Sequence, residues 1–267
     1  MRKGTKVREI IRYDFDGMQR QTDEIAVEFP LTIMLNGEEI GTMVCTPLDM
    51  ENLVVGYLAS EGMIRKADQI KELKIDEERG FAYVEAPSAS GRTHPLEKRW
   101  LGSCCGKSRA FYFQSDAITA RTVTSTLIIR PEQCLALMEE FHQSASMFQH
   151  TGGVHQASIA TTAGIEVTFA DIGRHNALDK LLGYMMKHKL PRKDRVILFS
   201  GRISSEVLLK VSKMGIGCLL SKSAPTDLAL QLADDLNITA IGFVRGSRMN
   251  IYTHPERIGE VEASSTK

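Results

Sequence analysis

Between residues 154 and 252 the sequence alternates between strand-like and helical patterns, and this alternation is the feature that most limits its fold. Short apolar and β-branched runs predict strands at residues 154–160, 165–170, 196–200, 216–221, 238–244 and 249–252. Apolar residues at helical spacing predict helices at about residues 173–188, 204–214 and 225–236. Such alternation is typical of a layered α/β domain, here with a largely parallel sheet.

A smaller α+β unit is expected before this domain. Strands at residues 25–35 and 38–45 flank Asn36-Gly37, a strong hairpin signal, and a capping pattern at residues 46–49 opens a helix over about residues 47–62. A strand at 81–85 and a loop at 86–97 follow, and a helix at about 131–148 opens the second half. We therefore predict an N-terminal domain at residues 1–124, ending in the loop region of Cys104-Cys105, and a C-terminal α/β domain at residues 125–267.

Charge and cysteine content exclude several classes of protein. The chain of 267 residues carries 33 Lys and Arg against 33 Asp and Glu, so an overall basic surface for nucleic acid is not expected. The N-terminus lacks the apolar core of a signal peptide, and the longest apolar runs are far too short for a membrane span. The five cysteines are odd in number and scattered apart from one adjacent pair. We expect a cytoplasmic protein with reduced thiols that does not act in a membrane.

Four predicted loops leave the carboxyl ends of strands, and each combines small or hydroxyl residues with a cation. They lie at residues 171–175, 200–205, 221–223 and 245–248 and contain Arg174, Arg202, Lys222, Arg245 and Arg248. Ligands of open α/β sheets bind at this edge, where helix N-termini favour anions and arginine matches phosphate oxygens. The loops predict a site for a phosphorylated or polyanionic ligand. The alternative is that they only form turns with solvated cations. Neither a P-loop nor a dinucleotide-binding glycine motif occurs.

The segment at residues 102–109 is the candidate for sulfur chemistry. Cys104 and Cys105 lie between glycines and beside two cations, and nearby positive charge lowers the pKa of a thiol and favours the reactive thiolate. Adjacent cysteines do not readily form a mutual disulfide, so a thioredoxin-like dithiol is disfavoured. The alternative is a buried apolar pair. Cys45, Cys134 and Cys218 are expected to be buried, because each stands in an apolar strand or helix pattern.

Histidine and metal chemistry gave weaker signals. His155 and His175 are candidates for acid–base or ligand-contact groups, although a lone histidine is more often structural. Zinc is not expected, because the sequence lacks a CxxC and a second closely spaced Cys/His pair that would complete four ligands.

Several of these segments together resemble the FdhD family of formate dehydrogenase accessory sulfurtransferases. The resemblance runs from about residue 24 to residue 258 and depends most on the string DIGRHNALDK at residues 171–180. Supporting segments are EGMI at 61–64, CGK at 105–107, Thr151-Gly152 with His155, SGR at 200–202, SAPT at 223–226, Gly242-Phe243 and YTHP at 252–255.

The resemblance implies a function and a set of partners. It implies a homodimer that accepts persulfide sulfur from a cysteine desulfurase and passes it to the molybdenum of the bis(molybdopterin guanine dinucleotide) cofactor, which then enters formate dehydrogenase. It also implies that the C-terminal domain binds this cofactor and has a cytidine-deaminase-like fold. The zinc signature of active deaminases is absent, so deamination is not expected.

Site residues are carried over by position. Cys105, with Cys104, falls on the sulfur-carrying loop, and the stretch Phe243, Val244, Arg245, Gly246, Ser247 and Arg248 falls on the cofactor-binding segment. The last of the four cation-bearing loops lies in that stretch, so the argument from the loops and the argument from the resemblance agree. The other candidate cofactor contacts are Arg174, His175, Arg202 and Lys222. Many family members carry CxxC where this chain has Cys104-Cys105, which leaves the identity of the carrier open.

Two alternatives remain at this stage. The first is a cofactor-binding chaperone that delivers the molybdenum cofactor without covalent sulfur chemistry. The second is an enzyme that acts on a free nucleotide, for which the sequence offers anion-binding loops without a convincing nucleophile and base.

Overall fold

A six-stranded mixed sheet forms the centre of the second half of the chain. The structure is a computed structural model that describes residues 3–87, 100–101 and 122–259. The strands are β8 (His155–Thr161), β9 (Gly164–Asp171), β10 (Val196–Phe199), β11 (Cys218–Ser221), β12 (Thr239–Arg245) and β13 (Arg248–Ile251), in the order β13-β12-β11-β10-β8-β9. All six predicted strands are present.

The predicted predominance of parallel pairing is wrong. Only β10 with β11 and β11 with β12 pair in parallel, and the other three pairings of this sheet are antiparallel. The reason is the length of two connections. Two residues join β8 to β9, and two join β12 to β13, and such short turns can link only antiparallel neighbours.

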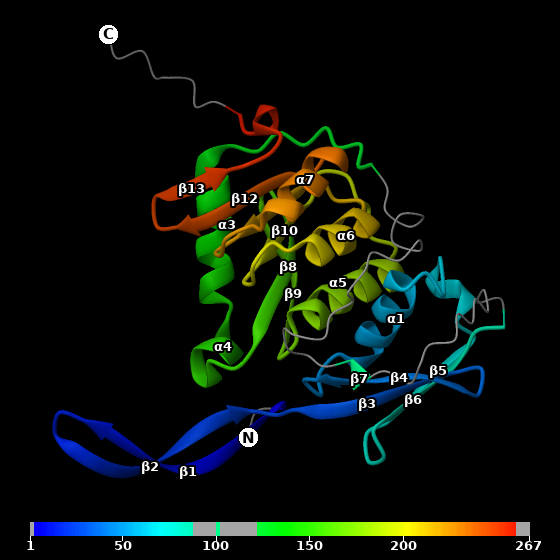
Figure 1. Cartoon of the computed structure of the whole chain (residues 1–267), viewed down its shortest axis with the longest axis vertical. Coiled ribbons are helices and arrows are strands. Elements are labelled where there is room, and N and C mark those ends of the chain that lie inside the picture. Colours follow the sequence, from blue (N-terminus) through cyan, green and yellow to red (C-terminus); the bar gives the residue numbers. More distant parts are fainter. Residues whose placement is uncertain (1–2, 88–99, 102–121, 260–267) are drawn as a thin grey trace.

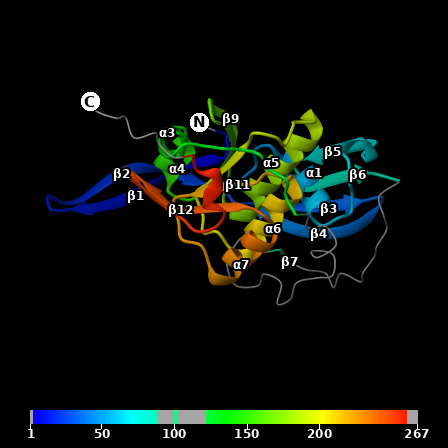
Figure 2. The same ribbon diagram turned by 90° about the horizontal axis from the view of Figure 1, so that it is seen from above.

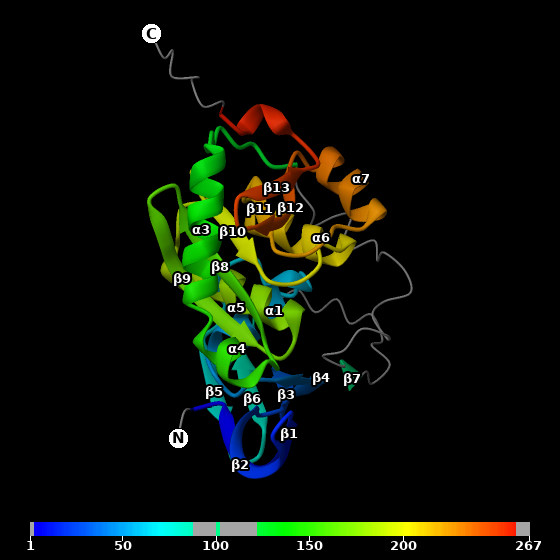
Figure 3. The same cartoon turned by 90° about the vertical axis from the view of Figure 1, so that its left-hand side faces the viewer.

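Helices cover both faces of this sheet (Figures 1 and 3). One face carries α5 (Arg174–His188), α6 (Ser205–Met214) and α7 (Asp227–Asp235), and the other carries α3 (Pro131–Gln143), which α4 (Ser146–Thr151) follows in the chain. Residues of β10 contribute alternately to the two cores: Ile197 and Phe199 pack on the α5 side, and Val196 and Leu198 pack on the α3 side. Burial on both faces explains why this strand is a continuous apolar run.

The predicted helix at 131–148 is interrupted. It ends at Gln143, and a second helix, α4, begins at Ser146. At the break the side chain of Gln156, from β8, donates to the carbonyl oxygen of Phe141 (3.3 Å) and to the hydroxyl of Ser144 (2.9 Å). The buried side chain of Gln156 therefore satisfies polar groups at the end of α3. The local sequence pattern did not indicate this end, because Gln156 belongs to another strand.

The first half of the chain forms a five-stranded sheet with one helix against it. The elements are β3 (Phe29–Leu35), β4 (Glu38–Cys45), α1 (Met50–Ser60), the 3₁₀ helix η1 (Ala67–Gln69), β5 (Glu72–Asp76), β6 (Phe81–Glu85) and β7 (Trp100–Leu101), with strand order β5-β6-β3-β4-β7. The hairpin at Asn36-Gly37 and the strand at 81–85 are confirmed. The helix begins three residues later than predicted, because Asp49 has a left-handed backbone conformation (φ 51°).

Strand β5 was not predicted from the sequence, and neither was a long hairpin that precedes β3. It consists of β1 (Thr5–Asp14) and β2 (Gly17–Ala26), which pair along their whole length and extend away from the rest of the molecule (Figures 1 and 2). Charged residues interrupt its apolar alternation, which concealed the strands. Asp16-Gly17 at its turn is the signal that would have revealed it.

Close packing of α1 on α5 joins the two halves of the chain. A Cβ atom on Gly56 would lie 1.8 Å from the carbonyl oxygen of Asp179, and one on Gly183 would lie 1.9 Å from that of Asn52. Only glycine permits the two helices to approach this closely. The predicted domain boundary at residue 124 stays a prediction. The two halves of the chain are in close contact through α1 and α5.

A buried ion pair connects β4, β9 and α5. The ammonium group of Lys180 lies 2.7 Å from Oδ2 of Asp171, and both side chains are fully buried. The same Oδ2 accepts from the backbone N–H of Thr46 (3.1 Å), and the Thr46 hydroxyl accepts from the N–H of Ile172 (3.0 Å). Oδ1 of Asp171 accepts from Asn176, whose amide also donates to the carbonyl oxygen of Val44. Each charge therefore has the partners that burial requires.

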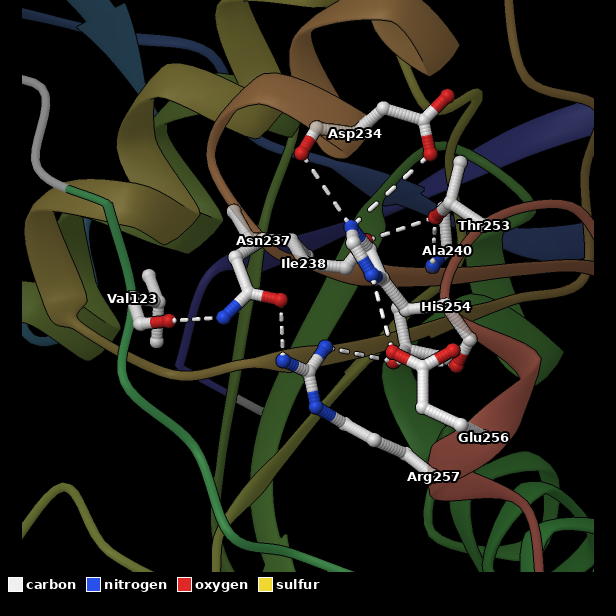
Figure 4. A network of polar contacts seen from close by, with 10 residues as sticks. Val123, Asp234, Asn237, Ile238, Ala240, Thr253, His254, Glu256 and Arg257 are labelled. Carbon is white, nitrogen blue, oxygen red and sulfur yellow. Dashed lines mark hydrogen bonds and ion pairs between the residues drawn. The ribbon is translucent and has the colours of Figure 1, made fainter.

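A second polar network fastens the C-terminal segment to the sheet (Figure 4). The hydroxyl of Thr253 donates to the carbonyl oxygen of Ile238 (2.7 Å) and accepts from the N–H of Ala240 (2.9 Å). Arg257, within the 3₁₀ helix η2 (Pro255–Arg257), donates to Thr239 and to Asn237, and the amide of Asn237 reaches the carbonyl oxygen of Val123 (2.7 Å). The segment at 252–255 thus has a structural role.

No helix of the described part of the chain is long and apolar enough to cross a membrane.

Replacing Lys180 with alanine is expected to lower the free energy of unfolding by about 3–5 kcal/mol, because the Asp171 carboxylate would remain buried without its partner. The matched control is Lys187→Ala on the same helix. Lys187 forms a partly exposed pair with Glu51, so its loss should cost less than about 1 kcal/mol. Denaturant unfolding of both variants measures the difference; equal losses would contradict the role of the buried pair.

Candidate functional site

The four cation-bearing loops lie along one edge of the six-stranded sheet. Strands β10, β11 and β12 run parallel, so their carboxyl ends meet at this edge. Because β8 is antiparallel to β10, it begins at the same edge, and β9 ends there with Asp171 opposite His155. The sheet topology therefore gathers segments that are far apart in the sequence.

A cavity of about 700 Å³ opens at this edge, between the loops and the helices α3 and α4. Its apolar lining consists of Leu135, Met138, Phe141, Ala145, Phe148, Val154, Ile172 and Val244. Its polar lining consists of Glu139, His142, His155, Gln156, Ser200, Lys222, Ser223 and Arg245, with the glycines 152, 153 and 246. A cavity with an apolar helix wall and a polar loop wall suits a ligand that has both a ring system and charged groups.

Two cations line the polar side of the cavity. Nε of Arg245 donates to the carbonyl oxygen of Lys222 (3.0 Å), so the two loops that carry them are joined. Burial lowers the pKa of Lys222, the nearby carboxylate of Glu139 opposes this, and the charge of Arg245 adds to the lowering. A phosphate bound here would gain from both charges and would relieve their mutual repulsion.

Serine hydroxyl groups fix the loops relative to one another. Ser221 donates to the carbonyl oxygen of Gly201 (2.7 Å) and accepts from the N–H of Ser223 (3.0 Å). Ser223 in turn donates to the carbonyl oxygen of Ser200 (3.1 Å), and its own carbonyl oxygen accepts from the N–H of Phe243 (3.2 Å). The cavity wall is thus organised before any ligand binds, which lowers the entropic cost of binding.

The last loop owes its shape to a bulge in β12. The pairing of β12 with β13 shifts register between Gly242 and Arg245, and Phe243 has a left-handed backbone conformation (φ 53°) that bulky residues rarely adopt. The bulge leaves Phe243 exposed, while Val244 is buried. Such a distortion aims the following residues of the loop at the cavity and is a common feature next to binding sites.

His155 lies in the cavity lining where β8 begins. Its Nδ1 is 3.4 Å from the hydroxyl oxygen of Ser200, which also accepts from the N–H of Gln156 (2.9 Å). Burial, followed by the charges of Arg174 and His175, lowers the pKa of His155 below its ordinary value. Its imidazole is therefore neutral at pH 7 and can accept a proton or a hydrogen bond from a ligand.

The predicted contact residues divide into two groups. Lys222, Val244, Arg245 and Gly246 line the cavity, whereas Phe243, Ser247 and Arg248 are exposed in the same bulge and turn without lining it. Arg174, His175 and Arg202 do not line the cavity either; the first two begin α5, and Arg202 is exposed before α6.

His175 has a partner on α6. Its Nε2 lies 3.0 Å from Oε2 of Glu206, and this contact is the main cause that lowers the pKa of the Glu206 carboxyl. The pair links the beginning of α5 to the beginning of α6, close to His155. It therefore fixes the position of one of the charges that influence His155.

The helix wall of the cavity was missed at the sequence level. Met138, Phe141 and Glu139 on α3 and Phe148 on α4 belong to a helix that was predicted, but its position against the loops was unknown. The only signal was Thr151-Gly152 with His155, which placed the end of this helix near a candidate site residue.

The described cysteines are buried, as predicted. Burial, with a smaller contribution from the charge of Asp171, raises the pKa of Cys45 to about 12, and burial raises that of Cys134 to about 12. Burial also raises the pKa of Cys218 strongly. These thiols are poor nucleophiles at neutral pH. Cys104 and Cys105 lie outside the described residues.

Metal ligands do not gather in the part of the chain that the structure describes: it contains no group of three or more His, Cys, Asp or Glu side chains suited to hold an ion.

Fold and cavity together define an α/β protein with a cation-lined cavity at the carboxyl ends of its strands. Comparison with known proteins is more specific: the model of the FdhD/NarQ family matches residues 26–259. The chain belongs to this family, and the resemblance inferred from the sequence is confirmed.

Relatives and a solved structure extend this match over nearly the whole chain. The chain is 52% identical over 255 residues to the sulfur carrier protein FdhD of Bacillus licheniformis, covering 95% of this chain and 97% of that one. It is 51% identical over 265 residues to the protein of that name from Bacillus subtilis, covering 97% and 99%. A crystal structure described as a formate dehydrogenase accessory protein from Desulfotalea psychrophila has a TM-score of 0.77 at 24% identity, covering 95% and 99%, and supports the fold. The cytidine-deaminase-like description stays a prediction.

Alkylation of the native protein should distinguish the buried cysteines from the two proposed sulfur carriers. With iodoacetamide at neutral pH, Cys45, Cys134 and Cys218 are expected to stay unmodified, because their thiols are buried and their pKa values are raised, while label accumulates on Cys104 and Cys105. Peptide mass spectrometry locates the label, and unfolded protein, in which all five react, is the control. Rapid labelling of Cys218 in the native protein would contradict the buried assignment.

The lowered pKa of His155 predicts a loss of stability in mild acid. The unfolded chain protonates this residue near its ordinary pKa of about 6.5, whereas the folded chain does so only at lower pH, so the unfolded state binds more protons and the free energy of unfolding falls as the pH is lowered through this window. His155→Gln should reduce the slope between about pH 7 and pH 5. The exposed His150→Gln is the control and should retain the wild-type slope.

Proposed function

We propose that this protein is a sulfur carrier for the maturation of formate dehydrogenase. In this proposal it accepts persulfide sulfur from a cysteine desulfurase in the cytoplasm and transfers it to the bis(molybdopterin guanine dinucleotide) molybdenum cofactor before that cofactor enters formate dehydrogenase. Family membership and relatives about 50% identical that are named sulfur carriers support the carrier role. The observation that carries the cofactor part is the preformed cavity with Lys222 and Arg245 on one wall.

The cavity suits part of such a cofactor. Its volume of about 700 Å³ lies within the usual range of ligand sites, about 300–1,000 Å³. The side chains of Lys222 and Arg245 suit pyrophosphate oxygens, and Phe141, Met138 and Phe148 offer apolar surface for a planar ring. The neutral imidazole of His155, in the lining of the cavity, can accept a proton or a hydrogen bond from the ligand.

Cys104 and Cys105 are the proposed sulfur carriers. In the loading step, the thiolate of one of them attacks the outer sulfur of the donor persulfide, a new S–S bond forms, and the donor cysteine leaves as a thiolate. The buried Cys45, Cys134 and Cys218 do not suit this step, since their thiols are protonated and inaccessible at neutral pH. The choice between the two adjacent cysteines is a matter for experiment.

A cofactor chaperone is the second candidate. Lys222, Arg245 and the other described residues of the lining can bind an anionic cofactor by charge and shape, and such binding does not by itself require covalent sulfur chemistry. In that case both cysteines would be dispensable for maturation, whereas Lys222 and Arg245 would be essential.

The deciding experiment is intact-protein mass spectrometry after incubation with a cysteine desulfurase and cysteine. Wild-type protein is expected to gain about 32 Da, one sulfur, in a form that dithiothreitol removes. The gain should disappear in the double variant Cys104→Ala/Cys105→Ala and in whichever single variant removes the carrier. Cys134→Ala is the matched control and should load normally, because Cys134 is buried.

A second set of variants separates loading from delivery. Lys222→Ala/Arg245→Ala should load sulfur like the wild type and fail to mature formate dehydrogenase, since the two cations of the cavity are removed while both cysteines remain. Normal maturation by the double cysteine variant would reject the carrier proposal and favour the chaperone.

A further inference from the structure

One charge in the cavity has the wrong sign for a polyanionic ligand. Glu139, on the α3 wall, is the single Asp or Glu among the described residues of the lining, whereas Lys222 and Arg245 supply positive charge on the loop wall. A carboxylate repels phosphate, so it lowers the affinity of an anion site unless it makes a contact of its own with the ligand. The position of Glu139 therefore requires an explanation.

Glu139 is not the direct counter-ion of the two cations. Within the described part of the chain its carboxylate takes part in no ion pair. Its charge acts on Lys222 from a longer distance and opposes the lowering of the Lys222 pKa. Nε2 of Gln143, one turn further along α3, donates to Oε1 of Glu139 (3.0 Å) and holds the carboxylate in place. Oε2 accepts no hydrogen bond from a described residue, so it is available to a ligand.

The surroundings of Glu139 suit a planar ring that has hydrogen-bond donors at its edge. Leu135, one turn earlier on α3, and Met138, which directly precedes Glu139, line the cavity together with Phe148 of α4. Such side chains offer apolar surface to the face of a ring, while a carboxylate among them can accept from N–H groups at the edge of the ring. The cavity thus has one wall suited to a ring and another suited to phosphate.

The rings of the proposed cofactor carry the matching edge. Guanine and pterin share a 2-amino-4-oxopyrimidine ring, in which a ring N–H and an amino group lie side by side. Two adjacent donors match the two oxygens of a carboxylate, and hydrogen bonds to a charged acceptor are the stronger kind. Adenine presents an acceptor nitrogen where guanine has the ring N–H, so it would place a lone pair against the carboxylate.

We propose that Glu139 selects a 2-amino-4-oxopyrimidine ring, as found in guanine and pterin, by accepting hydrogen bonds from its two adjacent N–H donors. The inference rests on the proposed function, because it takes the cavity as the cofactor site. It adds an orientation to that function: the ring lies against α3, and the phosphates lie at Lys222 and Arg245.

Isothermal titration calorimetry of the full chain with GDP, IDP and ADP tests the proposal. Wild-type protein is expected to bind GDP about tenfold more tightly than IDP, which lacks the amino group, and about 100-fold more tightly than ADP. Glu139→Gln should weaken GDP binding about 10-fold to 100-fold without weakening that of ADP. Glu132→Gln is the matched control: it removes the same charge from α3 outside the cavity lining and should leave all three affinities unchanged.

The sign of the change separates ring recognition from simple repulsion. If Glu139 only repels phosphate, Glu139→Gln strengthens the binding of all three nucleotides, and this result would overturn the proposal. Equal affinities of the wild type for GDP, IDP and ADP would also overturn it and would leave the cavity as the cofactor site. Circular dichroism checks that every variant is folded.

A phosphate variant distinguishes this inference from the proposed function on which it rests. Lys222→Ala/Arg245→Ala should weaken GDP, IDP and ADP alike and keep their order of affinity, because the three share their phosphates. A wild type that binds none of the nucleotides would reject the cavity as the cofactor site, and the inference with it.

Guanosine and neopterin decide which ring lies against α3. Both carry the selected edge, and neither carries a phosphate. The ring whose binding is weakened by Glu139→Gln and not by Glu132→Gln is the one that Glu139 selects, and either ring supports the proposal. Binding of both rings that is insensitive to Glu139→Gln would overturn it.

Discussion

The buried pair of Asp171 and Lys180 is the interaction on which the rest of the structure depends. Asp171 ends β9 at the edge that carries the cavity, and Lys180 lies in the second turn of α5. Through the backbone and hydroxyl of Thr46 the same pair holds the end of β4. Two charges in an apolar interior are tolerated only when their polar atoms have partners. The positions of β4, β9 and α5 therefore depend on one another.

This constraint gives the string at residues 171–180 a structural meaning. Asp171, Asn176 and Lys180 join the two halves of the chain, and Gly183, one turn further along α5, lets α1 approach closely. Arg174 and His175 stand between them at the beginning of α5, where their charges act on His155. A segment that looks like a binding motif is thus mainly the junction that positions the site. Its Ile172 lines the cavity, and the other lining residues come from β8, the later loops, α3 and α4.

Local patterns predicted most elements because their causes are local. The hairpin at Asn36-Gly37 and the strand at 81–85 follow from turn chemistry and apolar alternation, and the cations Lys222 and Arg245 stand out because they follow strands. The break in α3 was not predictable, because its cause is Gln156 from another strand. The sequence also grouped Arg174 and Arg202 with Lys222, whereas only Lys222 of the three lines the cavity. Arg174 begins α5 and Arg202 precedes α6, and spacing along the chain did not tell that these helices cover the face of the sheet opposite α3.

The sequence by itself determined the α/β class, the family, the buried character of Cys45, Cys134 and Cys218, and the order in which cation-bearing loops follow strands. These properties depend on residue type and short-range periodicity. Tertiary structure alone decided that the sheet is mixed, that α3 and α4 form the apolar wall of the cavity, and which cations line it. The physical reason is that a cavity is made by contacts between segments distant in sequence, and a buried ion pair and two glycines set how those segments meet.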